Sequence, residues 1–404
     1  MKRRNILIFI VILFCFGGLV GCNADKKENA DEYAIWMGTD DYLTEEGYYF
    51  TQDAANGNGI MLWYFDIVSG ITVPVCDKAE CAHQAVDLFS GESPSCNAQI
   101  EDYEIVVYKD QVYYLSGEDM KIVLRRRDKD GNNDEKVAAI DAPYMGERIW
   151  FYRDHAFIMA ATGVSQSFDP ETKESDDSVM RLFDADLKSG QTKILAESSL
   201  TERTNSAFTV YEMKDGKVSF YDLEKDKWYT YDVENEGLEE QKEIRERAIY
   251  GRAGEYWDIW ENYGYTFWED GLGNSSIACI DWKSGEEKTI YAGETGNTLG
   301  YYLNRQQNCM YIIESNWETG FQKIYYYDIE TGEMKQAAGE FEKDRKNGYP
   351  TIGSKEGFIY SYAVNQLEGQ AVYAGDFEYR YMSLEDLLNG TDKYQVVYYL
   401  DQEE

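Results

Sequence analysis

Short runs of aromatic and β-branched residues alternate with polar turns along most of the chain. One such run, Ile324–Tyr327, is followed at once by Asp328 and a few residues later by Gly332. Aromatic and β-branched side chains favour strands. Glycine supplies the positive φ that tight turns need, and aspartate can accept hydrogen bonds from its own turn. The pattern therefore predicts a strand, a tight turn and the start of another strand.

This combination of strand, aspartate and turn glycine recurs at fairly even intervals along the chain. Its turn glycines are Gly70, Gly131, Gly190, Gly237, Gly285, Gly332 and Gly390. A polar turn and another aromatic-rich strand precede each copy, so that each unit carries about four strands, as the units of a β-propeller do. One unit cannot bury both of its faces without neighbours. We therefore predict an all-β fold, a single β-propeller of four-stranded antiparallel blades, seven in number, with six or eight as the alternatives.

Three segments add detail to this prediction. Leu238–Arg247 and Ser383–Leu388 favour short helices between strands. Tyr394–Leu400 is predicted as the last strand of the chain. We hypothesise that Tyr33–Met37 pairs with this last strand, because closing the ring would remove exposed strand edges.

The N-terminal segment, 1–21, has the pattern of an export signal. Lys2, Arg3 and Arg4 precede a continuous apolar run, Ile6–Phe16. This order of charge and hydropathy is typical of a signal peptide. An uncleaved transmembrane anchor is the alternative.

The end of this segment, Leu19-Val20-Gly21-Cys22, resembles the lipobox of bacterial lipoproteins. The resemblance implies cleavage before Cys22, lipid on its sulfur and an acyl chain such as palmitate on its new amino group. More than one acyl chain anchors a protein firmly. We therefore divide the chain into a lipoprotein signal peptide (1–21), a lipidated Cys22 with a flexible polar tether (22–32) and the propeller (33–404). This organisation predicts a location on the extracytoplasmic face of the cell membrane.

The chain is strongly acidic. It has 75 Asp and Glu against 39 Lys and Arg, a formal net charge of −36. Such a charge repels nucleic acid and anionic lipid headgroups and favours solubility. We expect a monomer that binds no nucleic acid and contacts the membrane only through its lipid.

Three cysteines and a histidine lie close together in the first repeat: Cys76, Cys81, His83 and Cys96. Three thiolates and an imidazole would make a closed tetrahedral zinc site. A disulfide would suit an exported protein, but three cysteines leave one unpaired. A zinc site, a disulfide and free thiols are the three alternatives, and in each case we expect a structural clasp at a blade edge.

The densest group of aromatic residues includes Tyr256, Trp257, Trp260 and Trp268, next to several acidic residues. Exposed aromatic rings beside carboxylates would suit stacking on sugar rings, so these four residues are candidates for ligand binding. Packing between blades would also use large aromatic side chains.

Motifs for catalysis are not evident. His83 and His155 are the two histidines, and the sequence contains no G-x-S-x-G, no phosphate-binding glycine loop and no H-E-x-x-H. We therefore assign no catalytic residue and no certain cofactor.

The whole pattern resembles the uncharacterised β-propeller lipoproteins of Gram-positive, Firmicutes-type anaerobes. The shared features are the lipobox, the Cys-x4-Cys-x-His…Cys-Asn-Ala element and the repeated Asp-x-x-Thr/Ser-Gly-Glu turns. The resemblance implies an anchored extracytoplasmic propeller and no particular activity. We expect a scaffold that binds a glycan or a surface protein. The alternative is a carbohydrate-active enzyme, a glycosidase or lyase, that uses carboxylates of the central channel.

Overall fold

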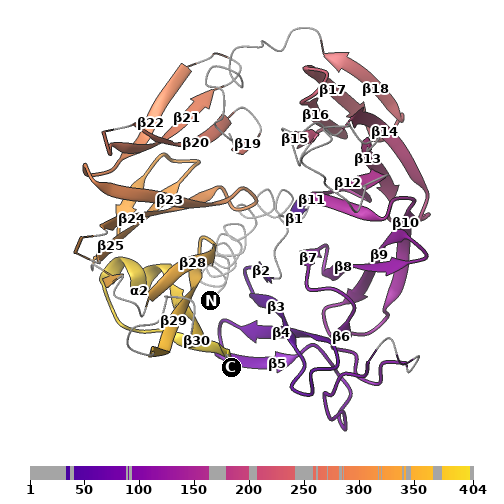
Figure 1. Cartoon of the computed structure of the whole chain (residues 1–404), viewed down its shortest axis with the longest axis horizontal. Helices are drawn as coiled ribbons and strands as arrows, with labels where there is room; N and C mark the ends of the chain where they lie inside the picture. Colours follow the sequence, from indigo (N-terminus) through magenta and orange to yellow (C-terminus); the bar gives the residue numbers. More distant parts are fainter. Residues whose placement is uncertain are drawn as a thin grey trace, which may run out of the picture.

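The described residues form seven small antiparallel sheets arranged around a common axis, as the blades of a propeller are (Figure 1). The computed structural model describes residues 33–36, 41–87, 90, 93–162, 179–199, 207–241, 258–260, 263–270, 272–281, 284, 286–316, 318–319, 321–338, 341–342, 347–366 and 375–400. In each sheet the four main strands pair in the order of the sequence, while β6 (Gln99–Ile100) adds to β4 (Ile60–Asp66) and β27 (Phe341–Glu342) adds to β25 (Phe321–Asp328). The prediction of an all-β propeller with seven blades is confirmed.

Each blade is built from one stretch of chain, apart from the strand that β1 adds to blade three. Blades one and two contain β2 (Asp41–Leu43), β3 (Gly47–Asp53), β4 (Ile60–Asp66), β5 (Ile71–Pro74) and β6 (Gln99–Ile100), then β7 (Ile105–Tyr108), β8 (Gln111–Glu118), β9 (Lys121–Asp128) and β10 (Glu135–Ile140). Blades three and four contain β1 (Tyr33–Trp36), β11 (Tyr144–Tyr152), β12 (His155–Thr162), β13 (Val179–Asp186) and β14 (Thr192–Ser199), then β15 (Phe208–Lys214), β16 (Lys217–Asp222), β17 (Lys227–Asp232) and β18 (Gly237–Gln241).

The second half of the ring repeats this plan. Blades five and six contain β19 (Asp258–Trp260), β20 (Tyr263–Glu269), β21 (Ser275–Asp281) and β22 (Glu286–Ala292), then β23 (Asn297–Asn304), β24 (Cys309–Asn316), β25 (Phe321–Asp328), β26 (Met334–Gln336) and β27 (Phe341–Glu342). Blade seven contains β28 (Asn347–Gly353), β29 (Gly357–Gln366), β30 (Gly375–Ser383) and β31 (Gln395–Leu400), with the helix α2 (Leu384–Asn389) between its last two strands.

The repeated aspartate holds the turn between the third and fourth strands of a blade. In blade six, the N–H of Thr331 donates to Asp328 Oδ1 (2.9 Å), and the N–H of Gly332 donates to the Asp328 carbonyl oxygen (2.8 Å). Gly332 has a φ of 70°, which glycine adopts without steric penalty. The same bonds form at Asp66–Gly70 and Asp186–Gly190. The repeated motif thus has one structural role in these three blades.

Another repeated hydrogen bond defines the two faces of the ring. The residue that directly follows the third strand of a blade donates its N–H to a carbonyl oxygen in the turn between the first and second strands. The donor–acceptor pairs are Ile67 and Glu46 (3.4 Å), Leu187 and Asp154 (2.8 Å), Val233 and Gly216 (2.9 Å), Ile329 and Asn308 (3.0 Å), and Leu384 and Glu356 (2.7 Å). Both kinds of turn therefore lie on one side of the ring, the turn face. The connections between second and third strands lie on the opposite side, the loop face.

The hydrophobic cores lie between neighbouring blades. Val106 and Tyr113 of blade two pack with Phe151 and Ile158 of blade three in one such cluster. Equivalent clusters join blades one and two, three and four, five and six, six and seven, and seven and one. Burying one large apolar side chain stabilises a fold by about 2 kcal/mol. These clusters account for much of the aromatic content of the sequence.

The hypothesis that Tyr33–Met37 pairs with the last strand is wrong. β1 pairs with β11, with Tyr33 opposite Tyr152 and Trp36 opposite Ile149, and lies near the centre of the ring (Figure 1). Within the described part of the chain, β31 pairs only with β30. Blades seven and one meet through side chains instead, and the stacked rings of Phe50 and Tyr398 have centroids 4.4 Å apart. Side-chain packing closes the ring here without a shared sheet.

The two helix predictions had different outcomes. α2 confirms the one at Ser383–Leu388, since Ser383 accepts the N–H of Asp386 as N-cap and Gly390 ends the helix with a φ of 64°. The prediction at Leu238 is wrong, because Leu238 lies in β18 opposite Tyr231. Pairing with β17 overrides the local helix propensity there.

Residues 242–247 of that prediction, and the predicted signal peptide and tether (1–32), lie outside the described residues. No helix in the described ranges is long and apolar enough to cross a membrane.

Candidate metal centre

The cysteine and histidine element lies in a loop that interrupts the outer strand of blade one. β5 pairs with one half of β4 and β6 with the other half. Leu62 is at the junction. Its carbonyl oxygen accepts the N–H of Val75 (2.9 Å), and its N–H donates to the carbonyl oxygen of Ala98 (2.8 Å). Residues 76–97 therefore leave β4 and return to it at the same point, and we name them the blade-one excursion.

The excursion brings the four candidate ligands together. Cys76 begins it, Cys96 lies near its end, and Cys81 and His83 come from between. The three Sγ atoms and an imidazole nitrogen all lie within 4.8 Å of one another. The distance between Cys96 Sγ and His83 Nδ1 is 3.6 Å. In a tetrahedral site with Zn–S of about 2.3 Å and Zn–N of about 2.0 Å, a sulfur and a nitrogen ligand are about 3.5 Å apart. The three cysteines form no disulfide in this structure.

Each of the three sulfur atoms accepts a hydrogen bond from the backbone N–H two residues further along the chain. The donors and acceptors are Lys78 and Cys76, His83 and Cys81 (3.4 Å), and Ala98 and Cys96 (3.4 Å). Hydrogen bonds to the charged form favour that form. These hydrogen bonds help to hold the three sulfur atoms in place, and cysteine binds metal ions in its thiolate form.

His83 has an unusual backbone conformation. Its φ is 51°, in the left-handed region that residues other than glycine adopt at a cost of about 1–3 kcal/mol. In this conformation its Nδ1 faces Cys96 Sγ. The strain is therefore associated with placing the imidazole beside the three sulfur atoms.

The thiols differ in acidity. Burial acts to raise the pKa of the Cys76 thiol. The N–H groups of Lys78 and Asn97 oppose this effect, as do the two neighbouring thiols, and the pKa of Cys76 lies below its usual value. Burial is the main cause that raises the pKa of the Cys96 thiol to about 12, and the adjacent thiols add to it.

Side chains connect the excursion to the turn between β9 and β10 in blade two. Asn97 Nδ2 donates to Asn132 Oδ1 (2.8 Å) and to Asp77 Oδ1 (3.2 Å), and Asn132 Nδ2 donates to Asp77 Oδ2 (2.6 Å). Gly131 in the same turn has a φ of 87°. A Cβ atom there would lie 2.2 Å from the carbonyl oxygen of Val75. The turn of blade two thus fits directly against the base of the excursion.

Arg127 of β9 adds further hydrogen bonds to this contact between blades one and two. Its guanidinium donates to the carbonyl oxygens of Asn97 and Gln99, the latter at 3.1 Å. It also donates to the hydroxyl of Tyr114 (2.8 Å) and lies 4.8 Å from the centroid of that ring. Sequence reasoning missed Arg127, Asn97 and Gly131. The closest signal was the Asn-Ala pair after Cys96, which places Asn97 beside a ligand.

Only part of the aromatic candidate group falls within the described residues. Tyr256 and Trp257 lie outside the described residues, as does the side chain of Trp260. The backbone of Trp260 pairs with Tyr263 at the turn-face end of β20. Trp268 is half-buried near the other end of β20, about 17 Å further along the strand at about 3.4 Å per residue. The structure therefore places Trp260 and Trp268 at opposite ends of blade five.

The second histidine belongs to a network between blades three and four. His155 Nδ1 lies 2.7 Å from Asp184 Oδ1, and the hydroxyl of Tyr231 donates to Asp184 Oδ2 (2.9 Å). Burial acts to lower the pKa of His155. The hydrogen bond and charge of Asp184 outweigh it, with help from Asp186 and Asp154, and the pKa lies above its usual value. Both histidines of the chain thus have partners in the structure.

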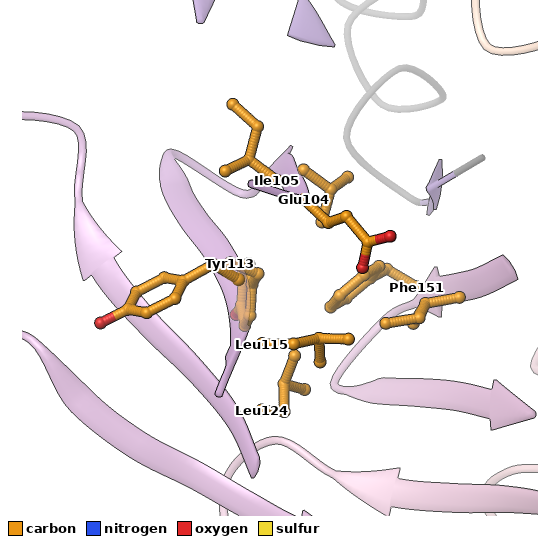
Figure 2. A pocket seen from close by; sticks show the side chains of 9 residues that line it. Glu104, Ile105, Tyr113, Leu115, Leu124 and Phe151 are labelled. Atoms are coloured by element: carbon orange, nitrogen blue, oxygen red, sulfur yellow. The ribbon is translucent and has the colours of Figure 1, made fainter. Parts of the chain in front are cut away.

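A small cavity lies between blades two and three. Figure 2 shows Ile105, Tyr113, Leu115, Leu124 and Phe151 around it, with the carboxylate of Glu104 at one side. It has room for about one water molecule. Ligand sites are larger by more than an order of magnitude, so this cavity is a packing defect rather than a substrate pocket.

Comparison with known proteins identifies the fold. No family model matches the chain, and no curated protein matches it. Among solved structures, acylaminoacyl peptidase of Pyrococcus horikoshii is 9% identical, with a TM-score of 0.50 over 90% of this chain and 52% of that chain. An oligogalacturonate lyase in complex with manganese is 12% identical (TM-score 0.47, 87% and 90% covered). The β-propeller domain of the Trilobed protease from Pyrococcus furiosus, described as having an open velcro topology, is 11% identical (TM-score 0.46, 89% and 94% covered).

These similarities concern the propeller alone. The chain spans about half the length of the acylaminoacyl peptidase, and sequence identities this low say nothing about its activity. The chain is similar to known β-propellers, and its function has to be argued from its own residues.

Proposed function

We propose that this protein is a lipid-anchored β-propeller on the extracytoplasmic face of the cell membrane, with its loop face turned outward as a binding surface. The observation that carries the proposal is the position of β1. Tyr33 pairs with Tyr152, which ends β11 beside the turn of Arg153 and Asp154. Tyr33 therefore lies at the turn face of the ring.

The first described strand is held firmly at this position. β1 adds to the inner edge of blade three, and the Tyr33 hydroxyl donates to the carbonyl oxygen of Arg305 (3.3 Å) in blade six, on the other side of the ring (Figure 1). A short segment, 23–32, separates Cys22 from Tyr33. A flexible chain of that length has an end-to-end distance of about 18 Å. A lipid on Cys22, as the lipobox implies, would thus keep the turn face toward the bilayer.

The loop face would then be the accessible one. The described strand ends that flank the longer connections, those between β12 and β13 and between β29 and β30, lie on this face. Loops on one face of a propeller commonly carry its binding function. The acidic composition of the chain favours a neutral or basic ligand, either a glycan or a surface protein.

A binding role agrees better than an enzymatic one with the chemistry of the described residues. His83 lies among three cysteines, and His155 is bonded to Asp184. The cavity at Ile105 and Phe151 is apolar and too small for a substrate. These observations support a scaffold rather than an enzyme.

Two exposed residues on opposite faces give a matched test of orientation. Val68 lies in a turn-face turn and is 90% exposed, and Leu272 lies in a loop-face connection and is 81% exposed. We expect a biotin maleimide attached to Leu272→Cys to bind streptavidin on intact cells, and the same label on Val68→Cys to bind it several-fold less. The wild-type chain gives the background from native cysteines. Equal binding at both positions would contradict the proposed orientation.

Two further experiments test the anchor and the role. Cys22→Ser should move the protein from the membrane fraction to the soluble fraction, and its retention in the membrane would contradict lipidation.

The purified protein should bind a glycan or a surface protein from a defined panel without converting it. Turnover of an oligosaccharide would instead support the carbohydrate-active alternative.

A further inference from the structure

We propose that Cys76, Cys81, His83 and Cys96 bind one zinc ion, and that this ion closes the base of the blade-one excursion. The four ligand atoms lie within 4.8 Å of one another. The distance of 3.6 Å between Cys96 Sγ and His83 Nδ1 is close to the edge length of about 3.5 Å in a tetrahedral site with these ligands. A small rearrangement of side chains would therefore complete the site.

The donor set favours a metal over a disulfide. A disulfide would join two of the three cysteines and leave the third thiol and the imidazole beside it without a role. A metal ion uses all four groups. The sulfur atoms of Cys81 and Cys96 each accept a backbone N–H, from His83 and Ala98, at 3.4 Å. Such hydrogen bonds orient and tune thiolate ligands at metal sites.

The same donor set points to zinc and to a structural role. Three thiolates and an imidazole in a tetrahedral arrangement suit Zn²⁺, whereas carboxylate and carbonyl oxygens would suit Mg²⁺, Ca²⁺ or Mn²⁺. Four protein ligands leave no open position for water or substrate, and closed sites of this kind are structural. The ion would therefore hold the chain in place and take no part in a reaction.

The excursion needs such a link because it has little core of its own. Its buried residues pack into a small cluster around Ala85 and Cys96, while Asp77–Glu80 are largely exposed. Segments that cannot bury enough apolar surface are commonly held by a metal or a disulfide. Because Cys96 precedes Asn97, an ion here would also fix the side chain that bonds the turn of blade two. The metal would thus stabilise the contact between blades one and two.

The first test is the metal and thiol content of the full-length protein, purified under anaerobic conditions. We expect about one zinc per chain by elemental analysis. Cys76, Cys81 and Cys96 should resist alkylation until a chelator is added, as peptide mass spectrometry can follow. Cys279, which is half-buried in blade five, serves as the internal reference and should react equally with and without the chelator.

Matched variants test the ligands one by one. Cys96→Ser and His83→Ala should each lower zinc affinity by at least ~100-fold, beyond the loss from removing a group that only orients a ligand. Cys279→Ser removes a thiol elsewhere and should retain one zinc. With cobalt in place of zinc, the wild type and Cys279→Ser should show the visible absorption of tetrahedral thiolate ligation, and His83→Ala should lose or shift it. Far-ultraviolet circular dichroism shows whether each variant is folded.

The outcomes are distinct. A zinc-free protein in which two of Cys76, Cys81 and Cys96 become alkylatable only after reduction would overturn the proposal and establish a disulfide. Zinc retained at one per chain in Cys96→Ser or His83→Ala would also overturn it. If Cys96→Ser does not fold, the alkylation of the wild type with and without chelator still decides the question. Chelation should also make residues 76–97 several-fold more sensitive to protease, and unchanged sensitivity would contradict the structural role.

Discussion

Replacing Gly131 with alanine tests the contact between the candidate metal centre and blade two. The same replacement at Gly332 is a matched control. Both glycines end the aspartate turn of their blades, with φ of 87° and 70°. They differ in what a Cβ atom would meet. At Gly131 it would lie 2.2 Å from the Val75 carbonyl oxygen and 3.1 Å from Asn97, whereas at Gly332 the nearest atom is the Tyr327 hydroxyl at 3.9 Å.

The expected magnitudes follow from this difference. The left-handed backbone costs an alanine about 1–2 kcal/mol at either position. At Gly131 the Val75 carbonyl must also move by roughly 1 Å, and overpacking of this kind adds about 1–3 kcal/mol. Gly131→Ala should therefore lower the free energy of unfolding by about 2–5 kcal/mol, and Gly332→Ala by about 1–2 kcal/mol. The excess at Gly131 measures the close contact between blades one and two.

Urea denaturation followed by tryptophan fluorescence measures both values, provided that zinc is kept at the same saturating concentration for each variant. We also expect faster proteolysis of residues 76–97 in Gly131→Ala, since the excursion would no longer fit against the β9–β10 turn. Gly332→Ala should leave that cleavage rate unchanged. Equal destabilisation by the two substitutions, with equal proteolysis, would refute the described contact.

Two further predictions concern buried charges. The pKa of His155 is raised by Asp184, so this pair stabilises the fold fully below pH of about 6.5 and loses its contribution as pH rises through the folded-state value. The wild type should therefore lose stability relative to His155→Gln over that range, and parallel pH profiles would contradict it. Glu314 is buried and accepts the Tyr291 hydroxyl at 2.6 Å, so Glu314→Gln should cost about 2–3 kcal/mol in urea denaturation. The control Glu333→Gln, at an exposed position, should cost less than about 0.5 kcal/mol.

The number of blades could be predicted because the turns are local. Asp328, Thr331 and Gly332 bond to one another within a single turn, so the same residue types recur wherever the same turn is built. The motif at Asp66, Asp186 and Asp328 marks one blade each, whereas Gly390 of blade seven ends the helix α2 instead. The aromatic runs beside them identify strands for the same reason, since each strand buries its side chains against the adjacent blade.

The candidate metal centre was predictable only in part. Cysteine and histidine are rare in this chain, so their grouping between residues 76 and 96 was visible in the sequence. The position of this group in the fold was not visible in the sequence. It depends on Leu62, whose backbone bonds to both ends of the excursion. Arg127 and Gly131 belong to the next blade, and only the seam between blades brings them to the site. Nothing in their local sequence distinguishes them from other strand and turn residues.

The strand that pairs with the N-terminal strand could not be predicted from the sequence either. Tyr33–Trp36 has a strand pattern, but strands pair through backbone groups that are alike in every residue. The inner or outer edge of another blade could accept it with equal hydrogen bonding. The choice of blade three is made by contacts that are distant in sequence, such as the Tyr33 hydroxyl on the Arg305 carbonyl oxygen and Ala34 in the cluster between blades two and three. That choice places the start of the propeller on the turn face, and the proposed orientation on the membrane depends on this tertiary contact rather than on any motif.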